Sequence, residues 1–129
     1  MSLKQSIHMM VVDDMTVSRG LIEQALDEIG VKNVQYESDP ALALRKLAVK
    51  PVHLVLSDYH MPGMTGIGLL EALRTNRTTQ RIGFILITGR PDKEILAQGQ
   101  KLGMNNFLVK PFSTHQLRIC IEKVVGPLG

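Results

Sequence analysis

The stretch IHMMVVDD, residues 7–14, begins the pattern that decides the fold of this chain. Residues 7–12 form a short, mostly apolar and β-branched run that is too brief for a helix and ends abruptly at two carboxylates, Asp13 and Asp14. Such a run is typical of a buried strand whose carboxyl end reaches solvent. The segment VHLVLSD, residues 52–58, repeats the pattern, because its apolar run also stops at a carboxylate, Asp58. We therefore predict two buried strands that both end at acidic residues.

Three further strands and five helices are predicted around these two strands. Short apolar runs indicate the remaining strands, over residues 33–37, 83–87 and 106–109. Apolar residues recur at helical spacing over residues 17–29, 42–47, 69–73, 95–102 and 117–125. Helix starts are indicated by Asp39 with Pro40 and by the capping-box pair Ser113 and Gln116. Gly99 interrupts the fourth helix, which we expect to be the least stable of the five.

Strict alternation of strands and helices implies a parallel sheet with right-handed crossovers and helices on both faces. Five such units are too few for a closed eight-stranded barrel. We therefore predict an α/β fold with a doubly wound five-stranded parallel sheet, flavodoxin-like with strand order 2-1-3-4-5, and five helices. This order places a ligand crevice at the carboxyl ends of the first and third strands. The length of 129 residues is typical of one domain, and we expect residues 1–129 to form a single one.

The composition excludes several classes of protein. Hydrophobic residues make up 44% of the chain and charged residues 21%, which is ordinary for a globular protein and too apolar for a disordered one. The single cysteine, Cys120, excludes an internal disulfide framework and a cysteine-based zinc site, and we interpret it as a core residue. No apolar stretch approaches the roughly 18 residues of a membrane span, and no secretory leader is recognised. We expect a cytoplasmic monomer with no membrane partner.

The positive charge of the chain is a weak indication of a nucleic-acid partner. The formal net charge is +3, but the 15 Lys and Arg residues are scattered and never form a run of three. The densest basic segment contains Arg74, Arg77 and Arg81, and we interpret it as a solvated loop. It has no interleaved aromatic residues on which bases would stack. We therefore predict no nucleic-acid partner.

Five polar residues follow the carboxyl ends of predicted strands: Asp13, Asp14, Asp58, Thr88 and Lys110. Each alone is more often a turn former, a helix cap or a solvated charge than a functional group. Together they lie at one edge of the predicted sheet, because the carboxyl ends of parallel strands meet there. Three carboxylates at one edge raise each other's proton affinity unless a cation joins them. Carboxylate oxygens in this number suit Mg²⁺, so we predict a magnesium site that leaves positions open for phosphate oxygens.

Lys110 and Thr88 complete a site for a phosphoryl group. The ammonium of Lys110 and the hydroxyl of Thr88 would hold the phosphoryl oxygens opposite the metal. No glycine-rich loop that cradles a nucleotide is present in the sequence. Asp58 is the best candidate for the nucleophile, because its strand is central in the predicted order. A carboxylate nucleophile gives an aspartyl phosphate, which water hydrolyses, so the modified state lasts for a limited time.

These residues resemble a known family. The set Asp13-Asp14, Asp58 with the following segment 61–66, Thr88 and the segment 107–112 is similar to the signature of the receiver domains of two-component response regulators. The resemblance extends from residue 7 to residue 125, and all five signature positions occur in order. With no output domain, the chain resembles the stand-alone chemotaxis regulators of the CheY type.

The resemblance implies roles for the acidic residues and their metal. Asp58 would accept a phosphoryl group from a phosphohistidine of a chemotaxis histidine kinase. Asp14 and Asp58 would bind Mg²⁺ directly, Asp13 would bind it through water, and the backbone carbonyl of His60 would be a further ligand. The chain would catalyse its own phosphorylation and dephosphorylation without being a conventional enzyme.

The resemblance also implies a switch. Lys110 and Thr88 would bind the phosphoryl oxygens, and the movement of Thr88 would vacate space into which the ring of Phe107 rotates. This movement would change the surface formed by the fourth helix, the fifth strand and the fifth helix. The peptide bond between Lys110 and Pro111 would be cis.

Three residues beside the site depart from the commonest chemotaxis pattern. His60 stands where Asn is frequent, and Gly89 and Arg90 stand where Ala and an acidic residue are frequent. The lifetime of the phosphorylated state therefore does not carry over from the family.

Three functions compete at this point. The leading hypothesis is a phosphorylation-dependent module that carries a signal from the histidine kinase to the flagellar motor switch protein. The alternative is a phosphate sink that drains the kinase by autodephosphorylation without binding the motor. A flavin-binding flavodoxin-like protein ranks far behind both, because Asp13 and Asp14 would repel the flavin phosphate and the chain has no Trp to cover the ring.

Overall fold

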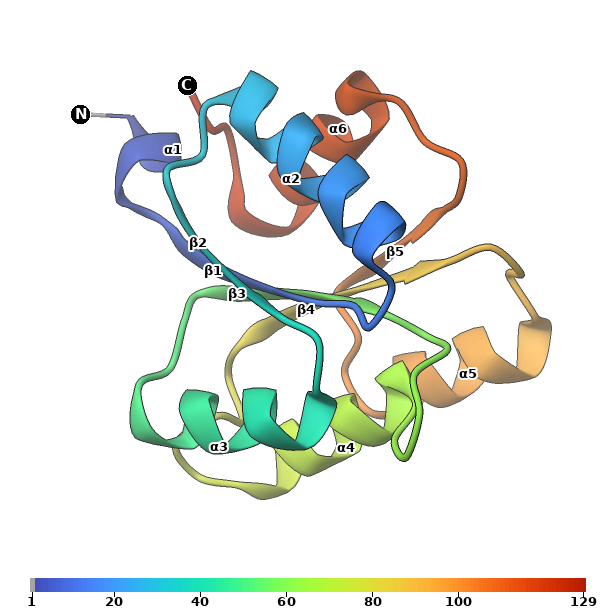
Figure 1. Cartoon of the computed structure of the whole chain (residues 1–129). Helices are drawn as coiled ribbons and strands as arrows, with labels where there is room; N and C mark the ends of the chain where they lie inside the picture. Colours follow the sequence, from blue (N-terminus) through green and yellow to red (C-terminus); the bar gives the residue numbers. More distant parts are fainter. Residues whose placement is uncertain (1) are drawn as a thin grey trace.

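A central parallel sheet with helices on both faces organises residues 2–129, the part of the chain that the computed structural model describes (Figure 1). The strands are β1 (His8–Val12), β2 (Asn33–Glu37), β3 (Leu54–Asp58), β4 (Gly83–Thr88) and β5 (Asn106–Val109). Their order in the sheet is β2-β1-β3-β4-β5, and every neighbouring pair is parallel. The predicted fold class and strand order are confirmed.

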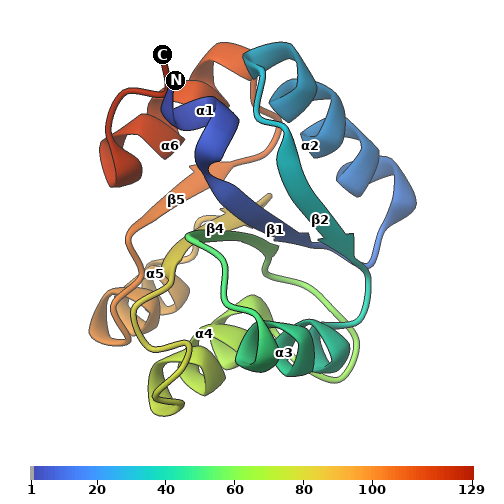
Figure 2. The ribbon, with the colours of Figure 1, turned by 90° about the vertical axis from the view of Figure 1, so that its left-hand side faces the viewer.

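The helices form two layers, one on each side of the sheet. One layer contains α1 (Leu3–Ser6), α2 (Thr16–Ile29) and α6 (Thr114–Val125) (Figure 1). The other contains α3 (Pro40–Val49), α4 (Gly66–Thr75) and α5 (Lys93–Lys101) (Figure 2). Within the described residues, no helix has both the length and the apolar character that a membrane crossing requires.

All five predicted helices are present, and the described residues add a sixth, the four-residue α1. It is a single turn that leads into β1. Its start is held by Gln5, whose side-chain oxygen accepts a hydrogen bond from the backbone N–H of Ser2 at 3.1 Å. The backbone N–H of Lys4 donates to the carbonyl of Leu128 at 2.9 Å, and the Leu128 side chain is fully buried. The extra turn therefore depends on the far end of the chain as well as on its own capping residues.

The apolar core has two parts, one on each face of the sheet. The strand residues of the part under α2 and α6 are Met9, Val11, Leu54, Leu56, Ile85 and Ile87. Those of the part under α3 and α4 are Met10, Val12, Val55, Phe84 and Leu86. Successive residues of a strand alternate between the two parts because successive side chains point to opposite faces. The central strands are thus buried on both faces, which explains their continuous apolar runs in the sequence.

The glycine inside α5 has a packing reason. Gly99 is buried, and a Cβ atom at this position would lie 2.7 Å from Sδ of Met104 and 3.3 Å from Cδ1 of Ile67. A larger residue would require the side chains of Met104 and Ile67 to move. Glycine lowers the stability of α5 as an isolated helix, but it allows Met104 and Ile67 to pack closely against the helix.

Arg74 corrects the interpretation of the basic segment as a solvated loop. It lies in the last turn of α4, and its guanidinium is half-buried rather than free in solvent. It donates hydrogen bonds to the carbonyls of Gln80 at 3.0 Å, Ile82 at 2.8 Å, Leu102 at 3.1 Å and Gly103 at 2.9 Å. One side chain thus joins the end of α4 to the segment before β4 and to the turn after α5.

Candidate functional site

Three carboxylates meet at the edge of the sheet where the strands end. Val12 pairs with Ser57 in the register of β1 and β3, so Asp13 and Asp58 follow neighbouring positions. Oxygen atoms of Asp13, Asp14 and Asp58 lie within 4.8 Å of one another. Asp13 is fully buried and Asp58 is 5% exposed. The structure therefore brings together the three acidic residues that the sequence placed at this edge.

Two oxygens of this cluster lack hydrogen-bond partners within residues 2–129. Asp13 Oδ1 accepts a hydrogen bond from the backbone N–H of Met15 at 3.0 Å. Asp13 Oδ2 and Asp14 Oδ1 are buried and have no hydrogen-bond partner within residues 2–129. Buried carboxylate oxygens without partners are costly, and a bound cation would satisfy them. The donor set is all oxygen and partly anionic, so it fits Mg²⁺.

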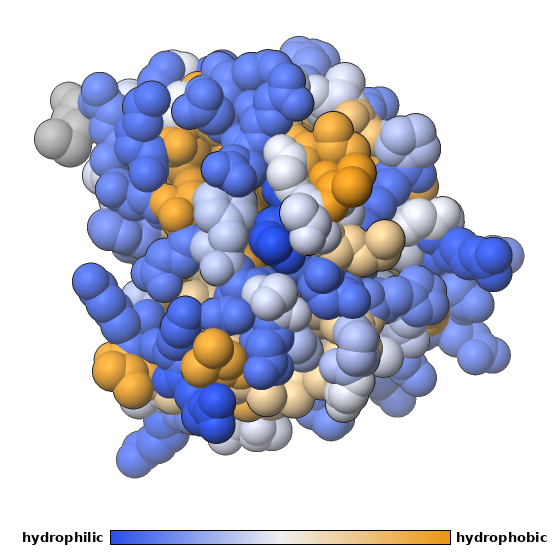
Figure 3. Space-filling model, in the orientation of Figure 1, coloured by the Kyte–Doolittle hydropathy of each residue, from blue (hydrophilic) through white to orange (hydrophobic). Residues whose placement is uncertain are grey.

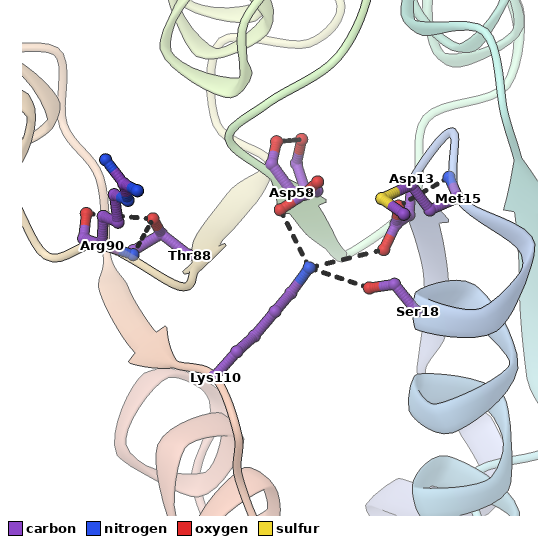
Figure 4. A network of polar contacts seen from close by, with 8 residues as sticks. Asp13, Met15, Ser18, Asp58, Thr88, Arg90 and Lys110 are labelled. Atoms are coloured by element: carbon purple, nitrogen blue, oxygen red, sulfur yellow. Dashed lines mark hydrogen bonds and ion pairs between the residues drawn. The ribbon is translucent and has the colours of Figure 1, made fainter.

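Lys110 places one positive charge in the cluster (Figure 4). Its Nζ atom lies 3.1 Å from Asp58 Oδ1 and 3.9 Å from Asp13 Oδ2. It also donates to the hydroxyl of Ser18 at 2.8 Å. One ammonium group balances only part of the charge of three carboxylates, so the site remains negative and attracts a further cation.

The surroundings of Asp58 favour its protonated form. Burial raises the pKa of Asp58 above its ordinary value, and the charge of Asp13 adds to this rise. The hydrogen bond and charge of Lys110 act in the opposite direction without cancelling it. A cation at the unpartnered oxygens would therefore also favour the ionised, nucleophilic form of Asp58.

Thr88 lies at the carboxyl end of β4 but is not hydrogen-bonded to the carboxylates. Its side chain is buried, and its hydroxyl donates to the carbonyl of Arg90 at 3.1 Å. The same hydroxyl accepts from the N–H of Arg90 at 3.1 Å. Figure 4 shows the hydroxyl turned toward Arg90 rather than toward Asp58. The predicted phosphoryl contact of Thr88 would require this hydroxyl to leave Arg90.

Two other predicted residues, His60 and Phe107, lie on the loop after β3 and on β5. His60 is exposed, and its ring packs edge-on against Tyr59 with 4.8 Å between centroids. Phe107 is 36% exposed on β5, and its carbonyl accepts a hydrogen bond from Cys120 Sγ at 3.5 Å. Burial raises the pKa of the Cys120 thiol to about 11, in agreement with its interpretation as a core residue. The Lys110–Pro111 peptide bond is cis, as the resemblance implied.

The loop after β3 is fixed by a glycine. The N–H of Gly66 donates to the carbonyl of Tyr59 at 2.9 Å. A Cβ atom at Gly66 would lie 2.5 Å from the carbonyl oxygen of Asp58 and 2.7 Å from Cδ1 of Leu86. The start of α4 can therefore approach the backbone of Asp58 only at a residue without a side chain.

Two polar residues of the site were not singled out from the sequence. Arg19 donates from Nη1 to the carbonyl of Asp13 at 2.7 Å, and Ser18 accepts from Lys110. Both lie in the first turn and a half of α2, directly after the loop that carries the aspartates. Ser18 and Arg19 follow Asp14 by only four and five positions, and this closeness in the sequence is the signal that could have placed them at the site.

An apolar surface borders the site. The start of α2 exposes its N-cap residue Met15 (58%) together with Val17 (75%) and Leu21 (59%). Figure 3 shows apolar residues gathered over α2 in this view. A groove of about 630 Å³ runs between α2 and the start of α6 and reaches Lys110. The site therefore opens beside a surface suited to contact with another molecule.

The fold and the acidic site define a receiver domain. The chain belongs to the response regulator receiver domain family, whose model matches residues 9–122. It is similar to the probable chemotaxis protein CheY of Rhizobium etli, with 38% identity over 128 residues and 99% of each chain covered. The resemblance to receiver domains of the CheY type is thereby confirmed.

Solved structures agree with this assignment. The chemotaxis protein CheY4 of Vibrio cholerae has a TM-score of 0.84 and 26% identity, over 92% of this chain and 98% of that one. The receiver domain of the histidine kinase CKI1 of Arabidopsis thaliana has a TM-score of 0.83 and 25% identity, over 94% of this chain and 91% of that one. The Arabidopsis domain was solved in complex with Mg²⁺ and BeF₃⁻.

Proposed function

We propose that this chain is a phosphorylation-dependent switch of a chemotaxis two-component system and that Asp58 accepts the phosphoryl group. The observation that carries the proposal is the buried Asp58 carboxylate, 3.1 Å from the Lys110 ammonium and beside two further aspartates. The name of the Rhizobium etli relative supports a role in chemotaxis. The phosphoryl donor is a phosphohistidine of a histidine kinase, and the reaction takes place in the cytoplasm.

The residues present fit a magnesium ion. Asp14 and Asp58 would hold it directly, Asp13 would hold it through water, and the backbone carbonyl of His60 would complete the protein ligands. The unpartnered oxygens of Asp13 and Asp14 support this assignment, as does the Mg²⁺ complex of the Arabidopsis domain. When bound, Mg²⁺ supplies the positive charge that offsets the carboxylates and the phosphoryl oxygens during transfer.

The transfer itself uses three residues of this chain. A carboxylate oxygen of Asp58 attacks phosphorus, the bond between phosphorus and the histidine nitrogen breaks, and the electron pair leaves with the imidazole. The ammonium of Lys110 moves from the carboxylate to a phosphoryl oxygen, where negative charge accumulates. The hydroxyl of Thr88 leaves Arg90 and donates to another phosphoryl oxygen. Water later cleaves the acyl phosphate and resets the switch.

The output surface lies on α5, β5 and α6. Movement of Thr88 frees space at the end of β4, and the Phe107 ring turns inward from the neighbouring strand. Phe107, Val109 and Ile119 are 36%, 37% and 40% exposed, so this face offers apolar side chains to a partner. The partner is the flagellar motor switch protein, and the domain acts as a monomer. The groove beside Lys110 offers a separate surface to the domain that carries the phosphohistidine.

The decisive experiment is phosphotransfer from a ³²P-labelled histidine kinase in Mg²⁺, followed by a chase that measures the lifetime of the label. We expect stoichiometric acid-labile label on the wild type and on Asp27→Asn, which changes an exposed aspartate of α2. We expect none on Asp58→Asn. Full labelling of Asp58→Asn would show that another residue is the acceptor.

A binding measurement decides between the switch and the phosphate sink. A motor switch peptide is expected to bind the phosphorylated chain more tightly than the unphosphorylated chain. Equal binding in both states, together with rapid loss of the label, would favour the sink. His60, Gly89 and Arg90 flank the site, so the lifetime has to be measured on this chain.

A further inference from the structure

Ser18 makes the shortest polar contact of the Lys110 ammonium. Nζ lies 2.8 Å from Ser18 Oγ, compared with 3.1 Å from Asp58 Oδ1 and 3.9 Å from Asp13 Oδ2. Ser18 and Lys110 are 92 positions apart in the chain. Figure 4 shows the lysine side chain extended across the site, with its ammonium between the serine and the aspartates. Ser18 is the neutral acceptor in this arrangement, and the other two are carboxylates.

The hydroxyl of Ser18 is not used by its own helix. Ser18 is the third residue of α2, a position whose side chain often bonds the backbone of the first turn. In this structure its Oγ atom accepts from Lys110 and has no other hydrogen bond to the described part of the chain. Ser18 therefore joins α2 to the residue after β5, and the helix gains no cap from it.

The contact with Ser18 contributes most to the position of Lys110 once Asp58 is phosphorylated. Transfer bonds one Asp58 oxygen to phosphorus and moves the negative charge outward onto the phosphoryl oxygens. The attraction of the Asp58 carboxylate for the Lys110 ammonium then weakens, and the lysine side chain is 26% exposed on a flexible four-carbon stem. Ser18 is the one hydrogen-bond acceptor of Lys110, among those the described residues supply, that transfer leaves chemically unchanged.

We propose that Ser18 is a positioning residue that holds the Lys110 ammonium toward the incoming phosphoryl group before and after transfer. The inference rests on the proposed function and adds a residue to its site. Ser18 acts through Lys110, and in this proposal it is hydrogen-bonded neither to the carboxylates nor to the phosphoryl group. Loss of its hydroxyl frees the lysine to sample solvent and weakens the charge that stabilises transfer.

The test compares Ser18→Ala and Ser18→Thr with the wild type. Initial rates of phosphorylation by acetyl phosphate are measured in Mg²⁺ over a range of donor concentrations. Ser18→Ala is expected to lower the maximal rate about three- to tenfold, as for the loss of one hydrogen bond of typical net strength, with an apparent KM within about twofold of the wild type. Ser18→Thr keeps the hydroxyl and is expected to restore the rate. Thr16→Ala changes an exposed residue of the same helix turn and is the matched control.

A second measurement does not depend on phosphorylation. The Lys110 ammonium protons are followed by ¹⁵N-resolved NMR in metal-free protein, with Lys110→Arg to assign the signal. We expect faster hydrogen exchange in Ser18→Ala than in the wild type and in Ser18→Thr. The inference would be overturned if Ser18→Ala left the hydrogen exchange of the Lys110 ammonium unchanged, or if its maximal phosphorylation rate equalled that of the wild type. A wild type that is not phosphorylated at all would instead refute the proposed function.

Discussion

Replacement of Asp58 by Asn is expected to stabilise the metal-free protein. The change removes two like-charge interactions, since oxygens of Asp13 and Asp14 lie within 4.8 Å of those of Asp58. At an effective dielectric constant of about 20, each costs at least about 3.5 kcal/mol, the value at the 4.8 Å limit. It also removes one attraction, to Lys110 at 3.1 Å, worth about 5 kcal/mol. The balance is a gain of at least about 2 kcal/mol, or on the order of 8 °C in Tm.

The raised pKa of Asp58 sets the pH dependence of this gain. A carboxyl whose folded pKa lies above its unfolded value contributes stability at low pH and loses it as the pH rises through the folded pKa. The ionised group is therefore unfavourable at neutral pH. We expect the advantage of Asp58→Asn to be largest at neutral pH and to disappear below about pH 4, where an unfolded Asp is itself protonated.

The assay is thermal unfolding by circular dichroism in EDTA and then in millimolar Mg²⁺. In EDTA, Asp58→Asn is expected to melt above the wild type, whereas the control Asp27→Asn stays near it. Mg²⁺ is expected to raise the Tm of the wild type more than that of Asp58→Asn, because binding to the native state relieves more repulsion there. An Asp58→Asn variant that melts at or below the wild type in EDTA, with an equal response to Mg²⁺, would refute the reasoning.

Three further predictions concern residues around the site and the core. The hydrogen bond from Lys46, at 2.8 Å, lowers the pKa of Glu37, so this carboxylate contributes stability above its ordinary pKa that is lost as the pH falls. Glu37→Gln should lower Tm at pH 7 and leave it near the wild type below about pH 3, as thermal melts across pH will show. Gly66→Ala places a Cβ atom 2.5 Å from the carbonyl oxygen of Asp58, so we expect it to cost about 2–4 kcal/mol of unfolding free energy in urea and to slow the labelling of Asp58. A urea midpoint equal to that of the wild type would contradict the packing argument. Arg74→Met leaves several backbone carbonyls without their donor and should lower the free energy of unfolding in urea by about 2–3 kcal/mol. Arg74→Lys should not restore this stability, because a single ammonium cannot reach all of these carbonyls.

The sheet and the carboxylate cluster could be predicted because they depend on local pattern and on the geometry of parallel strands. Each buried strand is a continuous apolar run, and the residue after it lies at the carboxyl edge whatever the loops do. Asp13 and Asp58 therefore meet as soon as β1 and β3 pair. No knowledge of side-chain conformation is needed for this step.

Contacts that depend on the rotation of a helix or on a side-chain conformation could not be predicted. The bond between Ser18 and Lys110 requires α2 to present one particular side to β5. The guanidinium of Arg74 turns inward because four carbonyls converge there, and those carbonyls belong to turns the sequence does not place. The bond of the Thr88 hydroxyl to the Arg90 carbonyl, two residues away, depends in the same way on a side-chain conformation.

The joined ends of the chain have a practical consequence for experiments with partners. The backbone hydrogen bond between Lys4 and Leu128 joins the two ends of the chain, and Figure 1 shows both ends beside α1, which leads into the amino end of β1. Asp13, Asp14 and Asp58 lie at the opposite, carboxyl ends of β1 and β3. A tag or fluorophore attached at either end would therefore leave the approach of a phosphohistidine unobstructed. The same end can be tethered to a sensor surface, which would orient every molecule with its reactive edge toward the solution.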